Sequence, residues 1–191
     1  MKRSNSTSAG AAFFRTARLC APVLALLLGA CTSPSHAESG NNNRAPEVPG
    51  ALQVPGETNK VHFHAYAVGV QIYAWSGTNW AFQSPDAVLF ADGVAHAEIG
   101  IHYAGPTWES QSGSKVVGVA VTNAPSPNAN SIPLLLIRAV STQGPGIFAQ
   151  TTYVQRVNTL GGRAPATAGT VTGQIARVPY TAEYFFYRAT E

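Results

Sequence analysis

Residues 102–118, HYAGPTWESQSGSKVVG, place a histidine, a glutamate and three serines within one short stretch of chain. An acyl-transfer site needs these residue types, because a hydroxyl nucleophile requires a histidine base and an acid that orients the base. The G-x-S-x-G elbow that presents such a serine is absent, and the serines surround a glycine, where hydroxyls commonly bond the backbone. We therefore expect a turn that shapes a site around His102, Trp108 and Glu109, in preference to a hydrolase triad.

Metal binding is a second possible chemistry, because histidine and glutamate alternate along residues 94–103. Side chains two residues apart on a strand point the same way, so His96, Glu98 and His102 could converge on one ion. His62 and His64 have the same spacing. None of these spacings is diagnostic, and a solvated strand face is the favoured interpretation. A metal-dependent enzyme or metal-binding protein that uses this face is the alternative hypothesis.

Other catalytic and cofactor sites find little support in the sequence. The acids are sparse, and no recognisable carboxylate pair for glycoside hydrolysis is found among the candidates Asp92, Glu98, Glu109 and Glu183. A dinucleotide or phosphate site would need a G-x-G-x-x-G turn after a strand or a P-loop, and neither is present. We therefore expect no cofactor, and the sequence leaves open whether the protein is an enzyme.

Tryptophan side chains offer a third possibility, an aromatic platform for a ligand. Trp80 and Trp108 border predicted turns, where a broad ring with a polar edge could receive a glycan or an apolar molecule. Packing into the core is the commoner fate of such residues and is the favoured interpretation for both. The candidate binding residues are therefore His102, Trp108, Glu109 and Trp80.

The elements that must position these residues are predicted to be short strands. From residue 60 onward, segments rich in β-branched and aromatic residues alternate with turn motifs such as SGTN, SPD, ADG and LGGRAP. The pattern predicts an all-β fold, either a single β-sandwich or a small closed barrel of about eight or nine short, mainly antiparallel strands. The predicted strands are 60–66, 68–75, 80–83, 87–91, 94–103, 115–123, 132–140, 147–157 and 178–188.

Residues 94–103 show the clearest alternation of apolar and polar side chains. The odd-numbered residues from Ala95 to Tyr103 are all apolar or aromatic, whereas the even-numbered residues include His96, Glu98 and His102. Because successive side chains of a strand point to opposite faces, we expect the apolar face to enter the core and the histidines to face outward.

The N-terminal residues have the features of an export signal. Residues 1–18 carry four basic residues and no acid, and the apolar run LCAPVLALLLGA follows at 19–30. That run is shorter than the roughly 20 residues of a membrane span. Its last residues, Leu-Gly-Ala, and the Cys31 that follows them resemble a bacterial lipobox, so we expect acyl chains, palmitate among them, at Cys31. The polar Thr32 after the cysteine favours the outer membrane. Cleavage after Ala37, which would give a secreted or periplasmic protein, is the alternative.

Three segments follow from this processing: a lipoprotein signal peptide at 1–30, lipidated Cys31 with a disordered tether over 31–56, and an all-β domain over 57–191. The tether is predicted from its Pro, Ser, Asn and Gly content. Without the leader, eight basic residues face nine acidic ones, a formal net charge of −1. The basic residues are scattered, so we expect contact with the membrane through the lipid anchor and no nucleic-acid partner.

Several blocks together resemble a known family. They are GVQIY, HYAGPTWE, GSKVVG, YVQRVNTLGGRAP and VPYTAEYFFY, in this order between residues 48 and 188. This set resembles the secreted bacterial and fungal family called domain of unknown function 3455. The resemblance implies an extracytoplasmic all-β domain and no established activity.

The same resemblance implies that two segments lie side by side. Members of the family often carry a cysteine at the position of Trp75 and another near Ala168, and both are missing here. Their joint loss is what a disulfide pairing would produce, which places these two segments adjacent in space. The family blocks also led us to expect a buried Arg156 paired with Glu109.

The function we predict from these observations is that of an envelope lipoprotein whose β-domain binds a glycan or a protein partner around Trp108 and His102. A metal-dependent enzyme that uses His96, Glu98 and His102 is the second hypothesis. A structural component of the envelope is the third.

Overall fold

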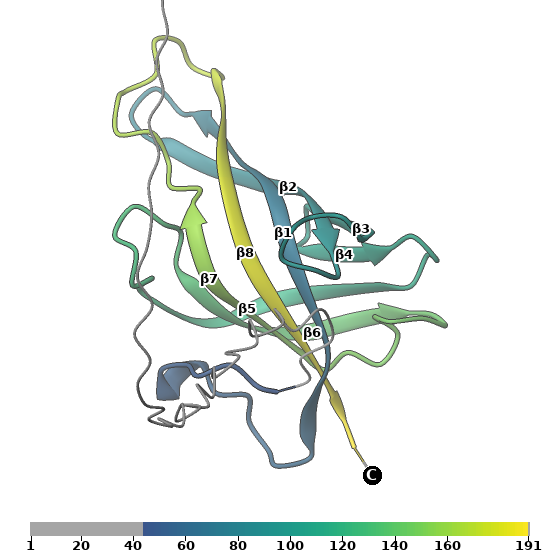
Figure 1. Ribbon diagram of the computed structural model, residues 1–191. Coiled ribbons are helices and arrows are strands. Elements are labelled where there is room, and N and C mark those ends of the chain that lie inside the picture. Colours follow the sequence, from purple (N-terminus) through teal and green to yellow (C-terminus); the bar gives the residue numbers. More distant parts are fainter. Residues whose placement is uncertain (1–43, 191) are drawn as a thin grey trace, which may run out of the picture. The chain divides into compact units, whose positions relative to one another are not determined.

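The computed structural model describes residues 44–190, so the expected signal segment and Cys31 lie outside the described residues. In this part of the chain a short 3-10 helix precedes eight β-strands (Figure 1). No helix among these residues is long and apolar enough to cross a membrane. The elements are η1 (Gly50–Leu52), β1 (Asn59–Trp75), β2 (Trp80–Phe90), β3 (Glu98–Tyr103), β4 (Thr107–Ser110), β5 (Lys115–Ala124), β6 (Leu134–Gln143), β7 (Tyr153–Gly161) and β8 (Ile175–Ala189).

The strands form one antiparallel sheet that closes on itself in chain order. Each strand pairs with the next, and β8 returns to β1 along nearly the whole length of both, with Asn59 opposite Ala189 and Ala74 opposite Ile175 (Figure 1). Closure gives every strand two neighbours and so removes the exposed edges of an open sheet. The predicted all-β, antiparallel fold is confirmed, and its single closed sheet is the second of the two expected architectures.

Two pairs of predicted strands are single strands in the structure. Segments 60–66 and 68–75 both belong to β1, and segments 80–83 and 87–91 both belong to β2. The SPD motif that we expected to form a turn therefore lies inside β2. The register between β1 and β2 shifts by one residue beside this motif, and such an irregularity is where a strand accommodates proline.

The segment 94–103 differs most from its prediction. The Asp92 carboxylate accepts hydrogen bonds from the backbone N–H groups of Val94, His96 and Ala97, so the first part of the segment is a loop and the strand begins at Glu98. Within β3, His102 is only 3% exposed, whereas Ile101 is 45% exposed. The prediction that the apolar face enters the core is therefore wrong at the end of this strand, where His102 and not Ile101 lies inside.

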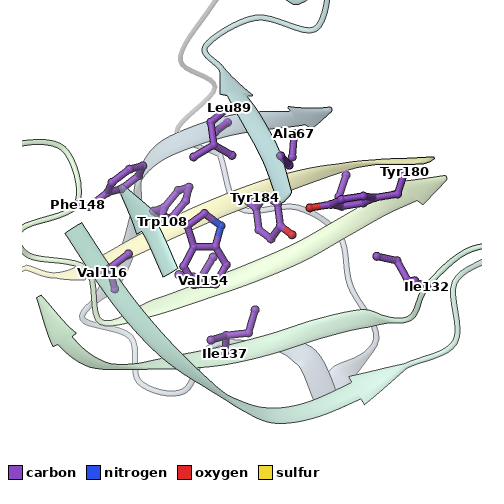
Figure 2. Packing of buried hydrophobic residues seen from close by; sticks show 14 residues of the cluster. Ala67, Leu89, Trp108, Val116, Ile132, Ile137, Phe148, Val154, Tyr180 and Tyr184 are labelled. Atoms are coloured by element: carbon purple, nitrogen blue, oxygen red, sulfur yellow. The ribbon is translucent and has the colours of Figure 1, made fainter. Parts of the chain in front are cut away.

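Aromatic side chains fill the interior of the ring. Figure 2 shows Trp108, Tyr184 and Phe148 packed among the strands, with Val116, Ile137 and Val154 around them. The β1–β8 seam contributes small residues to the same interior, namely Ala65, Ala67 and Ala182. These small side chains leave room for the large rings, because a core of fixed size is filled by interdigitating large and small residues.

A second apolar layer covers part of the ring from outside. Leu52 of η1 is 0% exposed and packs with Leu134 and Leu136 of β6, while Val48 and Val54 pack against these residues and against Phe185 and Tyr187 of β8. The Gln155 side-chain amide also donates to the Leu52 carbonyl oxygen at 2.6 Å. Residues 48–54, which we expected to belong to a disordered tether, therefore pack on the domain.

Candidate functional site

His102 and Trp108, two of the predicted site residues, form a stacked pair inside the ring. Their rings are parallel within 7°, with centroids 4.4 Å apart, and the indole is 0% exposed. His102 Nδ1 donates to the Thr107 carbonyl oxygen at 2.8 Å. Burial lowers the pKa of His102 to about 3, although the Thr107 carbonyl opposes this shift. The pair is a neutral part of the core, and Trp108 offers no exposed ring to a ligand.

Glu109 projects from the neighbouring position of β4 into a polar cluster. It accepts a hydrogen bond from the Tyr103 hydroxyl at 2.6 Å and pairs with Lys115 Nζ at 3.1 Å. The hydrogen bond from Tyr103 has the largest effect on the carboxyl of Glu109 and lowers its pKa, and the contact with Lys115 lowers it further. The expected pairing with Arg156 is wrong, because the Arg156 guanidinium donates to the Pro133 carbonyl oxygen instead.

The structure does not bring His96, Glu98 and His102 together. His96 and Glu98 are exposed, whereas His102 is buried in the ring. Among residues 44–190, no group of three or more His, Cys, Asp or Glu side chains is arranged to hold a metal ion.

The serines of the 102–118 segment stabilise a turn, as predicted. The Ser110 hydroxyl lies 2.9 Å from that of Ser112 and 2.8 Å from that of Ser114, and it accepts from the Ser114 backbone N–H. The Ser114 hydroxyl in turn accepts from the Phe148 backbone N–H. The hydroxyls therefore join the β4–β5 turn to the segment that follows β6.

Trp80, the remaining predicted binding residue, packs on Trp75 at the other end of the β1–β2 hairpin. The two ring centroids are 5.4 Å apart, and Trp80 Nε1 donates to the Thr167 carbonyl oxygen at 2.9 Å. A Cβ added to Gly169 would lie 2.5 Å from the Trp75 ring. The predicted adjacency of Trp75 and the segment around Ala168 is therefore confirmed.

A groove that the sequence does not reveal lies on the outer surface over β1, β8 and β7. These three strands are neighbours in the sheet, in the order β1, β8, β7 (Figure 1). The volume of the groove is about 490 Å³, and it continues the outer face whose other part residues 48–54 cover. Apolar and polar side chains share its lining. They include Tyr66, Val68, Asn128, Asn158, Leu160 and Glu183.

Glu183 is the charged centre of the groove. Its Oε2 lies 2.9 Å from Nε2 of His64, and its Oε1 accepts from the Asn158 side-chain amide at 2.9 Å. Burial acts to raise the pKa of this carboxyl, but the hydrogen bonds from His64 and Asn158 outweigh burial and leave the pKa below its usual value. Glu183 is therefore an ionised acceptor held in one orientation.

Aromatic rings fix the histidine that holds Glu183. His64 is buried and stacks on Phe185, with ring centroids 4.0 Å apart and planes within 13°, and the Tyr66 ring centroid lies 4.5 Å from it. Burial and the charges of Glu183 and Asp92 raise the pKa of Tyr66, so its hydroxyl stays protonated. The groove thus presents an aromatic ring, a hydroxyl donor and a carboxylate acceptor together.

Asn158 reaches Glu183 because the chain is irregular at this point. The β7–β8 register shifts between Val157 and Leu160, and Asn158 adopts a positive φ of 48°. Asparagine is one of the few residues that tolerate this left-handed conformation. An asparagine three residues before the glycine pair at 161–162 is the signal in the sequence that could have marked this irregularity.

Comparisons with known proteins agree with the resemblance noted in the sequence. Neither the curated proteins nor the solved structures contain a match to this chain. A family model described as Protein of unknown function (DUF3455) matches residues 55–188, which is most of the chain, and the chain therefore belongs to that family.

Proposed function

We propose that this protein is an envelope lipoprotein whose β-domain binds a glycan in the groove at Tyr66 and Glu183. The observation that carries the proposal is the convergence of an aromatic ring with an ionised carboxylate whose two oxygens are already oriented by His64 and Asn158. A sugar ring has an apolar C–H face that packs on an aromatic ring, and its hydroxyls donate to carboxylates.

The composition of the groove favours a glycan over a purely apolar ligand. Val68 and Leu160 supply apolar surface, while the side chains of Asn128 and Asn158 supply amide groups that both donate and accept. The volume of about 490 Å³ lies within the range of small-ligand sites. The proposed glycan site therefore lies on the outer face of β1 and β8, and not around Trp108 and His102 as the sequence led us to expect.

The anchor part of the proposal rests on the sequence. The basic residues at 1–18, the apolar run at 19–30 and the lipobox-like residues before Cys31 support export and lipidation. Dual acylation is enough for stable membrane attachment. The protein would then hold its groove at the surface of the outer membrane, where envelope glycans are within reach.

Glycan binding is tested by applying the full-length, detergent-solubilised protein to an array of bacterial envelope glycans. Tyr66→Ala should weaken binding about tenfold through loss of ring packing. Glu183→Gln keeps the side-chain size but removes the charge, and should weaken binding by roughly ten- to a hundredfold. Trp80→Ala is the matched control, because Trp80 lies outside the groove lining. Full binding by both groove variants, with loss in the control, would place the site at Trp75 and Trp80.

Lipidation is tested separately by feeding cells a labelled palmitate analogue. The wild-type protein should carry the label and sediment with outer membranes, and Cys31→Ser should do neither. A wild-type protein that is unlabelled and begins at Glu38 would instead support cleavage after Ala37.

A further inference from the structure

A second cavity borders the groove on the outer surface. Its volume is about 500 Å³, and Ser126 and Asn128 line both this cavity and the groove. These two residues belong to the loop that joins β5 to β6 and lies beside the end of β7 (Figure 1). An occupant of the groove can therefore extend past this loop into the second cavity. We call it the arginine pocket, because Arg163 is the charged residue of its lining.

The lining of the arginine pocket is polar and positively charged. Besides the Arg163 guanidinium it contains side-chain amides and hydroxyls, which come from Asn123, Asn128, Ser126 and Ser131. Within the described part of the chain, none of the lining residues is acidic. The groove has the opposite character, because its charged group is the Glu183 carboxylate. The two cavities therefore favour different parts of a ligand.

Arg163 is held in place but has no carboxylate partner. Its Nη1 donates to the Ala129 carbonyl oxygen, and no carboxylate among residues 44–190 forms an ion pair with it. A guanidinium has five N–H donors, and Arg163 is exposed, so its other donors are available to a ligand. Its planar fork matches the two oxygens of a carboxylate or a phosphate. The side chain is therefore suited to an anionic group.

The loop that forms the pocket is firmly attached to β7. The Thr159 hydroxyl donates to the Ile132 carbonyl oxygen at 2.7 Å, and the Gly161 backbone N–H donates to Ser131 Oγ at 3.0 Å. These hydrogen bonds fix the wall of the pocket before a ligand arrives. A preformed wall lowers the conformational entropy that binding would otherwise cost.

A second cation adds to the positive potential of the pocket. The Arg156 guanidinium donates to the carbonyl oxygen of Pro133, which is one of the lining residues. Burial raises the pKa of Tyr73, and the charges of Arg156 and Arg163 both act to lower it, so the two guanidiniums lie near the same hydroxyl. Charges of one sign that line a cleft raise the local concentration of oppositely charged ligands.

We infer that the ligand of the groove is an acidic glycan, whose carboxylate or phosphate binds Arg163 in the arginine pocket. The inference rests on the proposed function, because it names the class of glycan for the same site. The Glu183 carboxylate repels an anion, so the acidic group lies at Arg163 while neutral sugar hydroxyls donate to Glu183. The opposite charges of the two cavities thus fix the direction in which the glycan lies.

Chemically neutralised glycans test the inference on the full-length, detergent-solubilised protein. Each acidic glycan of the envelope array is compared with a neutral form, made by reducing its carboxylates to alcohols or by removing its phosphates. The wild type should bind the acidic form about tenfold more tightly, because the neutral form loses a charge-assisted hydrogen bond. The preference should shrink as the ionic strength rises, since Arg163 is exposed. The treatment that removes the preference shows whether the anion is a carboxylate or a phosphate.

Variants of two exposed arginines show whether Arg163 carries the preference. Arg163→Gln should bind both forms equally, with its affinity for the neutral form unchanged. Arg177→Gln removes the same charge outside both cavities, so this control should keep the full preference. Glu183→Gln should weaken the binding of both forms and keep the preference.

Two results would overturn the inference while leaving glycan binding intact. One is a wild type that binds acidic and neutral forms equally, and the other is an Arg163→Gln protein that keeps the preference, which would make Arg163 only a brace for the loop. A wild type that binds neither form would refute the proposed function itself, and the inference with it.

Discussion

His64 and Glu183 form a hydrogen-bonded pair across the seam of β1 and β8, with 2.9 Å between Nε2 and Oε2. The pair links the two strands by a side-chain contact, beside the backbone ladder that closes the ring, and it orients the carboxylate that faces the groove. The two residues are 119 positions apart in the chain, so their contact exists only because the last strand returns to the first.

The ionised form of Glu183 is predicted to stabilise the fold in a defined pH range. Because its pKa in the folded state is lower than the usual 4.5, the stabilisation is present above pH 4.5 and is lost as the pH falls through the lower, folded value. Asn158→Ala removes one of the two donors and should raise this pKa toward 4.5. An NMR titration of the Glu183 carboxyl carbon measures it, and an unchanged midpoint in the variant would show that Asn158 contributes nothing.

His102 is predicted to make the protein sensitive to acid over a different range. Its pKa falls from 6.5 to about 3 on folding. Between these two pH values the imidazole is protonated in the unfolded chain and neutral in the folded chain. Stability should therefore fall by up to about 1.4 kcal/mol per pH unit as the pH drops from 6.5 toward 3. Urea unfolding at pH 4, 5 and 7 gives the slope.

The matched variant for this prediction is His102→Phe, which keeps a planar ring on Trp108 and removes the titrating group. Its unfolding free energy should depend less on pH than that of the wild type. His62, whose pKa burial lowers to about 4, remains in both proteins and accounts for part of the residual slope. Identical slopes in the two proteins would mean that His102 does not titrate differently on folding.

Replacing Trp108 is predicted to destabilise the protein much more than replacing Trp80, because Trp108 is buried in the core and Trp80 is partly exposed. Trp108→Ala deletes a fully buried ring that contacts His102 and Tyr184, and should cost about 3–5 kcal/mol of unfolding free energy. Trp80→Ala removes a partly exposed ring and should cost much less, roughly 1 kcal/mol. Urea denaturation monitored by circular dichroism compares them, and equal losses would contradict this division.

The sequence predicts the strands well and the faces of the strands less well. Turn residues and β-branched segments place most strand positions correctly, because these signals are local. Alternation along residues 94–103 shows that two faces exist, but it does not show which one a closed ring turns inward. The inward position of His102 goes with its stacking on Trp108. Trp108 lies on β4, a four-residue strand inside a segment that the sequence predicts to be a turn.

The groove could not be predicted from the sequence, for a related reason. Its polar centre joins His64 on β1, Asn158 on β7 and Glu183 on β8, and spacing within one strand says nothing about which strands become neighbours. In the sequence, His64 stands out only through its spacing from His62, as a possible metal ligand. The chemistry of the groove therefore follows from ring closure, which a single sequence does not specify.

Residues 48–54 are predicted to contribute to the unfolding free energy of the domain. Leu52→Ala removes a fully buried side chain from the outer apolar layer on β6 and should cost about 2–5 kcal/mol of unfolding free energy. Gln53→Ala, at the adjacent exposed position, is the control and should change it by less than about 0.5 kcal/mol. Denaturant midpoints at constant slope provide the comparison. A Leu52→Ala protein as stable as the control would contradict this prediction. Residues 48–54 would then belong to the disordered tether, and the apolar residues on the outer face of β6 and β8 would be exposed.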